Sequence, residues 1–163
     1  MDNKYVKLHS ILRMLGALLA IIVFISMFIA KQVYNPNPGF GGDFFDFRNG
    51  AFFGDTEYGL CKGNVFGFFG YLFVLLGGLA GLAFVFIDEL IGKDLTKKLA
   101  FVAGGVAVLG AILVLLFAPM FIAINDFSFD RLTTTAAPIV FGIFGLVVGA
   151  INICAPILED KGM

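Results

Sequence analysis

The chain of 163 residues is 60% hydrophobic and only 14% charged, with a formal net charge of −1 at pH 7. Soluble globular domains carry about 25% charged residues, so this composition excludes that class and indicates a membrane protein. A net charge so close to zero gives no reason to expect a nucleic-acid partner.

Four apolar stretches reach or approach the length of a transmembrane helix. About 20 residues at 1.5 Å each are needed to cross roughly 30 Å of hydrocarbon. We therefore predict an all-α membrane protein, a four-transmembrane-helix bundle that forms one integral membrane domain over residues 1–163. The predicted spans are 14–30, 65–87, 99–124 and 136–157, with a long first outer loop over 32–63.

The first span is short, but Arg13 and Lys31 bracket it, and such side chains can reach toward the headgroups. A basic leader before an apolar run also fits a signal peptide. However, the run exceeds the usual length of about 7–15 residues, and residues 28–30 contain only one small residue for cleavage. We predict a retained helix after a solvated leader that contains His9, the sole histidine.

The first outer loop contains the stretch GFGGDFFDFRNGAFFGD, residues 39–55, with six phenylalanines. Burying such a side chain contributes about 1.5–3 kcal/mol, so we expect the loop to cap the bundle and to leave surplus aromatic surface for a partner. The Asn-Gly pair at 49–50 predicts a short hairpin over about 43–54. The residues assigned to this interaction surface are Phe44, Phe45, Phe47, Phe52, Phe53 and Cys61.

The two cysteines, Cys61 and Cys154, fall on opposite sides of the membrane in this topology, so they cannot pair within one chain. Cys61, on the outer side, could form a disulfide with a partner chain, or it could remain an unreactive thiol. For Cys154 we predict an inert packing role.

Turn and cap signals divide the rest of the chain. Asn64 is the expected N-cap of the second helix, Gly92 the stop between the second and third, and Asp94 the N-cap of the third. Pro119 should bend the third helix, whereas Pro138 falls in the first turn of the fourth, where proline is tolerated.

Small residues recur at helical spacing on three predicted spans, and Asn152 is a polar residue deep in the fourth. Close packing through small residues drives helix association in lipid, and an interhelical hydrogen bond contributes about 1 kcal/mol. The predicted helix-packing residues are Gly70, Gly77, Gly81, Ala103, Ala107, Ala111, Gly145, Gly149 and Asn152. Such seams serve either one compact bundle or a contact between subunits, and the sequence leaves both uses open.

Basic residues favour one orientation. The side with the two termini and the 88–98 loop carries seven Lys and Arg, and the other side carries four. By the positive-inside rule we predict that both termini are cytoplasmic.

The sequence lacks the residues that several kinds of transport and catalysis require. The four predicted spans contain no Asp, Glu, Lys, Arg or His, which argues against an ion-coupled transporter. HExxH, GxSxG and Walker sequences are also missing. We predict that the protein is not an enzyme and that it has no catalytic residue, no cofactor and no metal site.

The layout of four spans with a long first and a short second outer loop resembles that of claudin-type tetraspan proteins. The signature of that family requires Gly-Leu-Trp followed by two cysteines. This chain has Gly59-Leu60-Cys61, no tryptophan and no second outer cysteine, so we assign no family and transfer no functional residue.

The sequence therefore predicts a small tetraspan protein that acts by association, either as a homo-oligomer or as a subunit of a larger membrane complex. The contacts would be the small-residue seams and the aromatic outer loop. The alternative is an oligomeric channel or an uncoupled pore for small solutes, because uncharged, phenylalanine-rich helices suit a hydrophobic gate.

Overall fold

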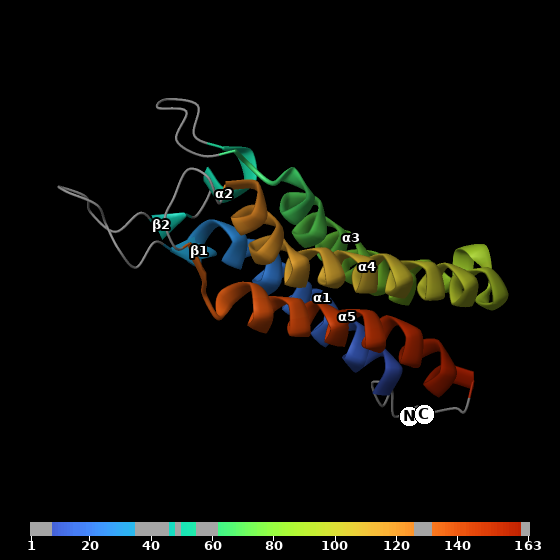
Figure 1. The fold of residues 1–163 in the computed structure, drawn as a ribbon. Helices are drawn as coiled ribbons and strands as arrows, with labels where there is room; N and C mark the ends of the chain where they lie inside the picture. Colours follow the sequence, from blue (N-terminus) through green and yellow to red (C-terminus); the bar gives the residue numbers. More distant parts are fainter. Residues whose placement is uncertain (1–7, 35–45, 48–49, 55–61, 126–131, 161–163) are drawn as a thin grey trace, which may run out of the picture.

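Four long helices pack side by side in a computed structural model that describes residues 8–34, 46–47, 50–54, 62–125 and 132–160 (Figure 1). They are α1 (Leu8–Ile29), α3 (Val65–Ile91), α4 (Lys93–Asn125) and α5 (Ala137–Asp160). Each is long and apolar enough to cross a membrane. The predicted all-α four-helix membrane bundle is confirmed, and the protein is a multi-pass integral membrane protein.

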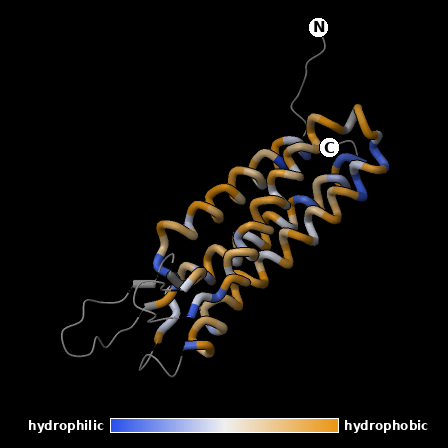
Figure 2. Tube along the Cα trace, turned by 90° about the horizontal axis from the view of Figure 1, so that it is seen from above, coloured by the Kyte–Doolittle hydropathy of each residue, from blue (hydrophilic) through white to orange (hydrophobic). Residues whose placement is uncertain are grey.

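The bundle has two distinct ends. The termini end contains the start of α1, the turn between α3 and α4, and the end of α5 (Figure 1). The loop end contains the end of α1, the start of α3, the end of α4 and the start of α5. Figure 2 shows hydrophobic residues along the length of the helices and hydrophilic residues gathered mainly at these two ends. This is the distribution that hydrocarbon around the middle of the bundle requires.

The helices extend beyond the predicted spans at the termini end. Helix α1 begins at Leu8 instead of residue 14, and α5 ends at Asp160 instead of residue 157. His9 and Arg13 consequently lie on α1 and are buried. The prediction of a solvated His9 was wrong, because the end of the predicted leader is a turn of helix that packs against the bundle.

Gly92 separates α3 from α4 as predicted, with a positive φ of 86° that suits glycine. Helix α4 begins at Lys93, so Asp94 lies inside its first turn instead of at the N-cap. Asn64 directly precedes α3, as predicted for its N-cap, and its carbonyl oxygen accepts a bond from the Gly67 N–H at 3.1 Å. Its side-chain Nδ2 donates to the Phe117 carbonyl at 3.4 Å. Helix α4 continues through Pro119, and Pro138 is the second residue of α5.

Short strands gather at the loop end. Strand β1 (Val33–Tyr34) lies between β2 (Asp46–Phe47) and β3 (Thr133–Thr134), and both pairs are antiparallel. The predicted hairpin over 43–54 was wrong, because β2 pairs with β1 and residues 50–53 form the short helix α2 (Gly50–Phe53). Strand β1 follows α1, and both of its edges are filled by strands from later in the chain.

The core changes character along the bundle. Small side chains fill the middle, among them Ala20, Ala107, Ala111 and Val148. Large aromatic side chains, Tyr71, Phe117 and Phe121, replace them toward the loop end. The helices can therefore approach closely in the middle, while the loop end needs rings to fill the wider space.

Candidate functional site

The predicted seam between α3 and α4 brings two backbones together. A methyl group built on Gly70 would lie 2.9 Å from the carbonyl oxygen of Gly110, and one on Gly110 would lie 2.6 Å from that of Gly70. About two turns further along α3, a methyl on Gly77 would lie 2.7 Å from the carbonyl oxygen of Ala103. Any larger residue at these positions would push the two helices apart.

The seam on α5 faces α4 in the same way. A methyl group on Gly145 would lie 2.9 Å from the β-carbon of Ala111, and one on Gly149 would lie 3.1 Å from the carbonyl oxygen of Gly104. Helix α5 therefore packs on the face of α4 beside the one that meets α3.

Asn152 connects α5 to α3. Its Nδ2 donates a hydrogen bond of 2.9 Å to the carbonyl oxygen of Gly77 within the buried centre. A side chain on Gly81 would collide with the amide of Asn152, so this glycine provides the space that the amide occupies. All nine residues predicted for helix packing are buried at contacts between helices of the same chain.

The loop end is closed by an aromatic plug. Helix α2 places Phe52 in the mouth of the bundle, where the side chain is only 1% exposed. Its ring stacks on Phe117 with centroids 4.7 Å apart and meets Tyr71 edge-on at 5.7 Å. At Phe52 the first outer loop thus covers the bundle, which is the arrangement that the sequence led us to expect.

Neutral hydrogen bonds tie the loop segments around this plug. The Tyr71 hydroxyl donates to Oε1 of Gln32 at 3.0 Å. Asn125 holds both backbone groups of Lys62, accepting from its N–H at 2.7 Å and donating to its carbonyl at 3.0 Å. The Thr135 N–H donates to the Gln32 carbonyl at 3.3 Å. Segments that follow α1, precede α3 and precede α5 are therefore fixed by uncharged groups.

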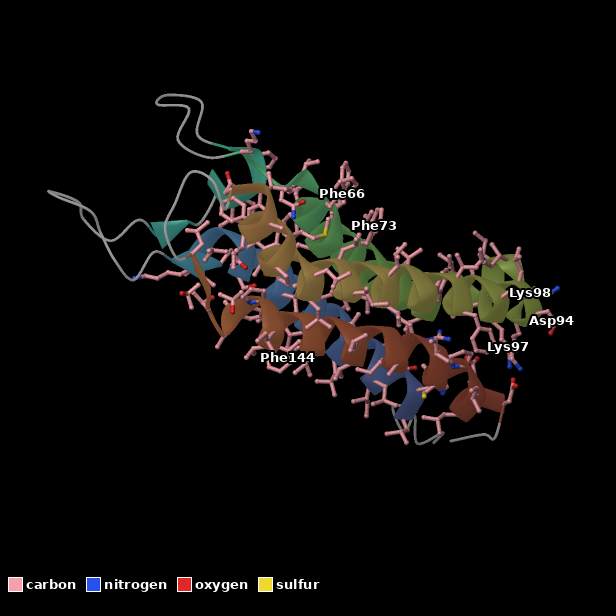
Figure 3. The ribbon with its side chains drawn as sticks, in the orientation of Figure 1. Phe66, Phe73, Asp94, Lys97, Lys98 and Phe144 are labelled. Carbon is pink, nitrogen blue, oxygen red and sulfur yellow. The ribbon has the colours of Figure 1, made fainter. Side chains whose placement is uncertain are left out.

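Phe53, next to the plug, points outward and is 57% exposed. It meets Phe68 at 5.3 Å between centroids, Phe68 meets Phe69 at 5.9 Å, and Phe69 meets Phe73 at 6.2 Å. Phe66 is 56% exposed and lies three residues before Phe69 on the same face of α3. We call Phe53, Phe66, Phe69 and Phe73 the aromatic ridge; Phe66 and Phe73 project away from the bundle in Figure 3.

Four other residues were predicted for the outer-loop interaction surface. Phe44, Phe45 and Cys61 lie outside the described residues, and Phe47 belongs to strand β2. Sequence reasoning missed three ridge members, Phe66, Phe69 and Phe73, because they belong to a predicted span. Their spacing of three and four residues on one helical face was the signal that could have found them.

The termini end is held by charge. Arg13, with a side chain 2% exposed, forms an ion pair of 3.4 Å with Glu159, whose side chain is 19% exposed. Lys97 pairs with Asp160, the residue after Glu159, in a more exposed position. Two carboxylates at the C-terminal end of α5 meet the negative end of the helix dipole, so basic partners from α1 and α4 offset an unfavourable placement.

A polar cavity of about 210 Å³ lies beside these pairs. It is lined by Lys93, Lys97, Pro156, Glu159 and Asp160. The sequence analysis did not identify the ion pairs. The opposite charges on one side of the membrane, at the ends of the first and last helices, were the available signal.

Two further expectations concern reactive groups. Cys154 is exposed on α5, so its predicted packing role was wrong. The described residues contain no group of three or more His, Cys, Asp or Glu side chains placed to hold a metal ion.

Comparisons with protein-family models, with curated proteins and with solved structures find no match to this chain. Its function has to be inferred from its own surfaces.

Proposed function

We propose that this protein acts by non-enzymatic association, with copies of itself or with other membrane proteins, through the aromatic ridge and the adjoining first outer loop. The observation that supports the proposal is the continuous run of ring contacts from α2 onto the outward face of α3. Extended exposed aromatic surface of this kind is typical of interaction sites.

The fold limits which surfaces can contact a partner protein. Sequence reasoning offered two contact surfaces, the small-residue seams and the aromatic loop. The seam residues are buried inside the chain, so in this fold they serve the bundle itself. A partner would therefore meet the ridge.

The competing explanation of the aromatic ridge is a belt of aromatic side chains at the interface between membrane and water. Ring pairs do occur on other helices, Phe24 with Phe28 on α1 and Phe141 with Phe144 on α5. The ridge differs from these pairs because it joins two elements and continues along about two turns of α3. That continuity favours a protein surface over scattered anchors in the headgroups.

The proposal includes the orientation of the protein in the membrane. The seven-to-four excess of Lys and Arg favours cytoplasmic termini, which would place the loop end and the ridge on the opposite side. An oligomeric pore would have to form between copies, because the described interior is filled by side chains such as Ala20, Val74 and Val148.

The test is the mass of the protein extracted in a mild detergent. The 17.6 kDa chain should be recovered in an assembly, and the double variant Phe66→Leu with Phe69→Leu should shift it to the monomer. Leucine keeps both positions lipophilic, so membrane insertion is preserved. Phe144→Leu, on α5 and on the opposite side of the bundle in Figure 3, is the matched control and should leave the assembly intact.

Recovery of a monomer from the native membrane, or an assembly that the double variant leaves unchanged, would refute the role of the ridge. Solute flux through liposomes that contain the purified assembly would instead support the pore.

A further inference from the structure

An apolar groove of about 280 Å³ runs between α3 and α4 on the outside of the bundle, in the half nearer the termini end. It arises from the seam: small residues let the two helices approach closely, and larger side chains on either side form the walls. The floor contains Gly77, Ala80 and Ala103, and the walls contain Leu76, Leu99 and Val102.

The position of the groove determines what can cover it. Its residues on α3 run from 76 to 84, which is about 12 Å along a helix and fits within the roughly 15 Å of one leaflet. The wall residues Leu76, Leu99 and Val102 are exposed, and every lining residue is apolar. The volume is just below the roughly 300 Å³ at which pockets begin to enclose a whole small molecule, so the groove suits one flexible hydrocarbon chain.

A basic side chain lies at the headgroup end of this groove. Lys98 precedes the wall residue Leu99 and stands four residues, about 6 Å, before Val102 on the same face of α4. Lys97 points toward α5 and pairs with Asp160, whereas Lys98 points away from α5 (Figure 3). In the part of the chain that the structure describes, Lys98 forms no ion pair or hydrogen bond.

We propose that the α3–α4 groove is a binding site for an anionic phospholipid of the leaflet at the termini end. One acyl chain lies along Gly77, Ala80 and Ala103, and Lys98 binds the phosphate. An unpaired lysine attracts anionic headgroups at the membrane surface, and the groove below it supplies the place for the chain.

The other lateral groove provides a comparison. It lies between α1 and α5 toward the loop end, has a similar volume of about 270 Å³, and includes Ile25, Ile29 and Phe141. Lys31, which follows the lining residue Ala30, takes part in an interaction within the structure. The basis for preferring an anionic lipid is therefore stronger at the α3–α4 groove.

The absence of tryptophan from the sequence permits a clean optical test. A single Leu76→Trp reporter at the membrane-centre end of the groove would be reconstituted in vesicles of phosphatidylcholine containing a minor fraction of dibrominated lipid. Bromine quenches tryptophan at contact, so comparing dibrominated phosphatidylglycerol with dibrominated phosphatidylcholine measures the lipid preference at this position.

We expect the anionic lipid to be favoured about fivefold, the factor that one lysine near the surface supplies. Lys98→Gln should abolish the preference, and Lys98→Arg should retain it. Leu116→Trp, on α4 but outside both grooves, should show no preference with Lys98 intact or in combination with Lys98→Gln or Lys98→Arg.

Two results would overturn the proposal. Equal quenching by both lipids at Leu76→Trp with Lys98 intact would show that the groove does not select an anionic headgroup. A reporter that neither lipid quenches, while Leu116→Trp is quenched by both, would show that protein covers the groove.

Discussion

The two ends of the bundle are closed by opposite means. At the loop end, rings and neutral hydrogen bonds enclose Phe52 and leave that side chain almost without exposure. At the termini end, two ion pairs join α5 to α1 and to α4, beside a polar cavity of about 210 Å³. One end relies on shape, and the other relies on charge.

This difference shows how a small bundle can combine a rigid end with an adjustable one. Packed rings lose contact energy abruptly when one is removed, because the interior cannot fill the gap. Ion pairs depend on geometry less strictly, and when exposed they weaken in salt. We therefore expect the loop end to respond to side-chain volume and the termini end to respond to charge and ionic strength.

The largest effect should come from the plug. Phe52→Ala should lower the free energy of unfolding by about 3 kcal/mol, because it leaves a cavity between Phe117 and Tyr71. Reversible unfolding of the detergent-solubilised protein by SDS, followed by the loss of helical circular dichroism, measures this change. Phe53→Ala removes the exposed neighbouring ring and should lower the free energy of unfolding much less than Phe52→Ala does. Equal losses for the two variants would mean that Phe52 does not seal the bundle.

The buried ion pair should give the next largest effect. Arg13→Met should lower the free energy of unfolding by about 2 kcal/mol. This is less than the roughly 3–5 kcal/mol lost when a fully buried pair is broken, because Glu159 retains some contact with water. The exchange of charges in Arg13→Glu with Glu159→Arg should recover part of the loss that either charge reversal causes alone. The same SDS titration provides the comparison, and strictly additive losses would show that the two side chains do not interact.

Composition and periodicity were sufficient to predict the four-helix bundle. The start of the second helix at residue 65, the turn at Gly92 and the small-residue spacing all follow from local rules, and the structure has Val65 as the first residue of α3 and a positive φ at Gly92. These signals are local because each depends on a few consecutive residues and on the thickness of the membrane.

Features that depend on distant segments were not predicted. The partner of strand β2 is β1, which belongs to the other side of the loop, and the partner of Arg13 is 146 residues away. Likewise, the seam spacing on α3 could not reveal that α4 would occupy it, since the same pattern serves contacts within and between chains. The outward spacing of Phe66 and Phe69 resembled an ordinary lipid-facing helix, so the aromatic ridge became recognisable only when α2 placed Phe53 beside it.

The smallest effect should come from the exposed pair at the termini end. The side chains of Lys97 and Asp160 are 38% and 57% exposed, so Lys97→Ala should lower the free energy of unfolding by only about 0.5 kcal/mol at low salt. Raising the salt to 1 M shortens the screening length to about 3 Å and should remove this difference.

Lys98→Ala is the matched control, because Lys98 has no ion pair among the described residues and should leave stability in lipid-free detergent unchanged at any salt concentration. Phe52→Ala should likewise keep its full cost in salt, since no charge contributes to the packing of that ring. A salt-dependent loss at Phe52, or a salt-independent one at Lys97, would contradict the division of the bundle into an end closed by shape and an end closed by charge.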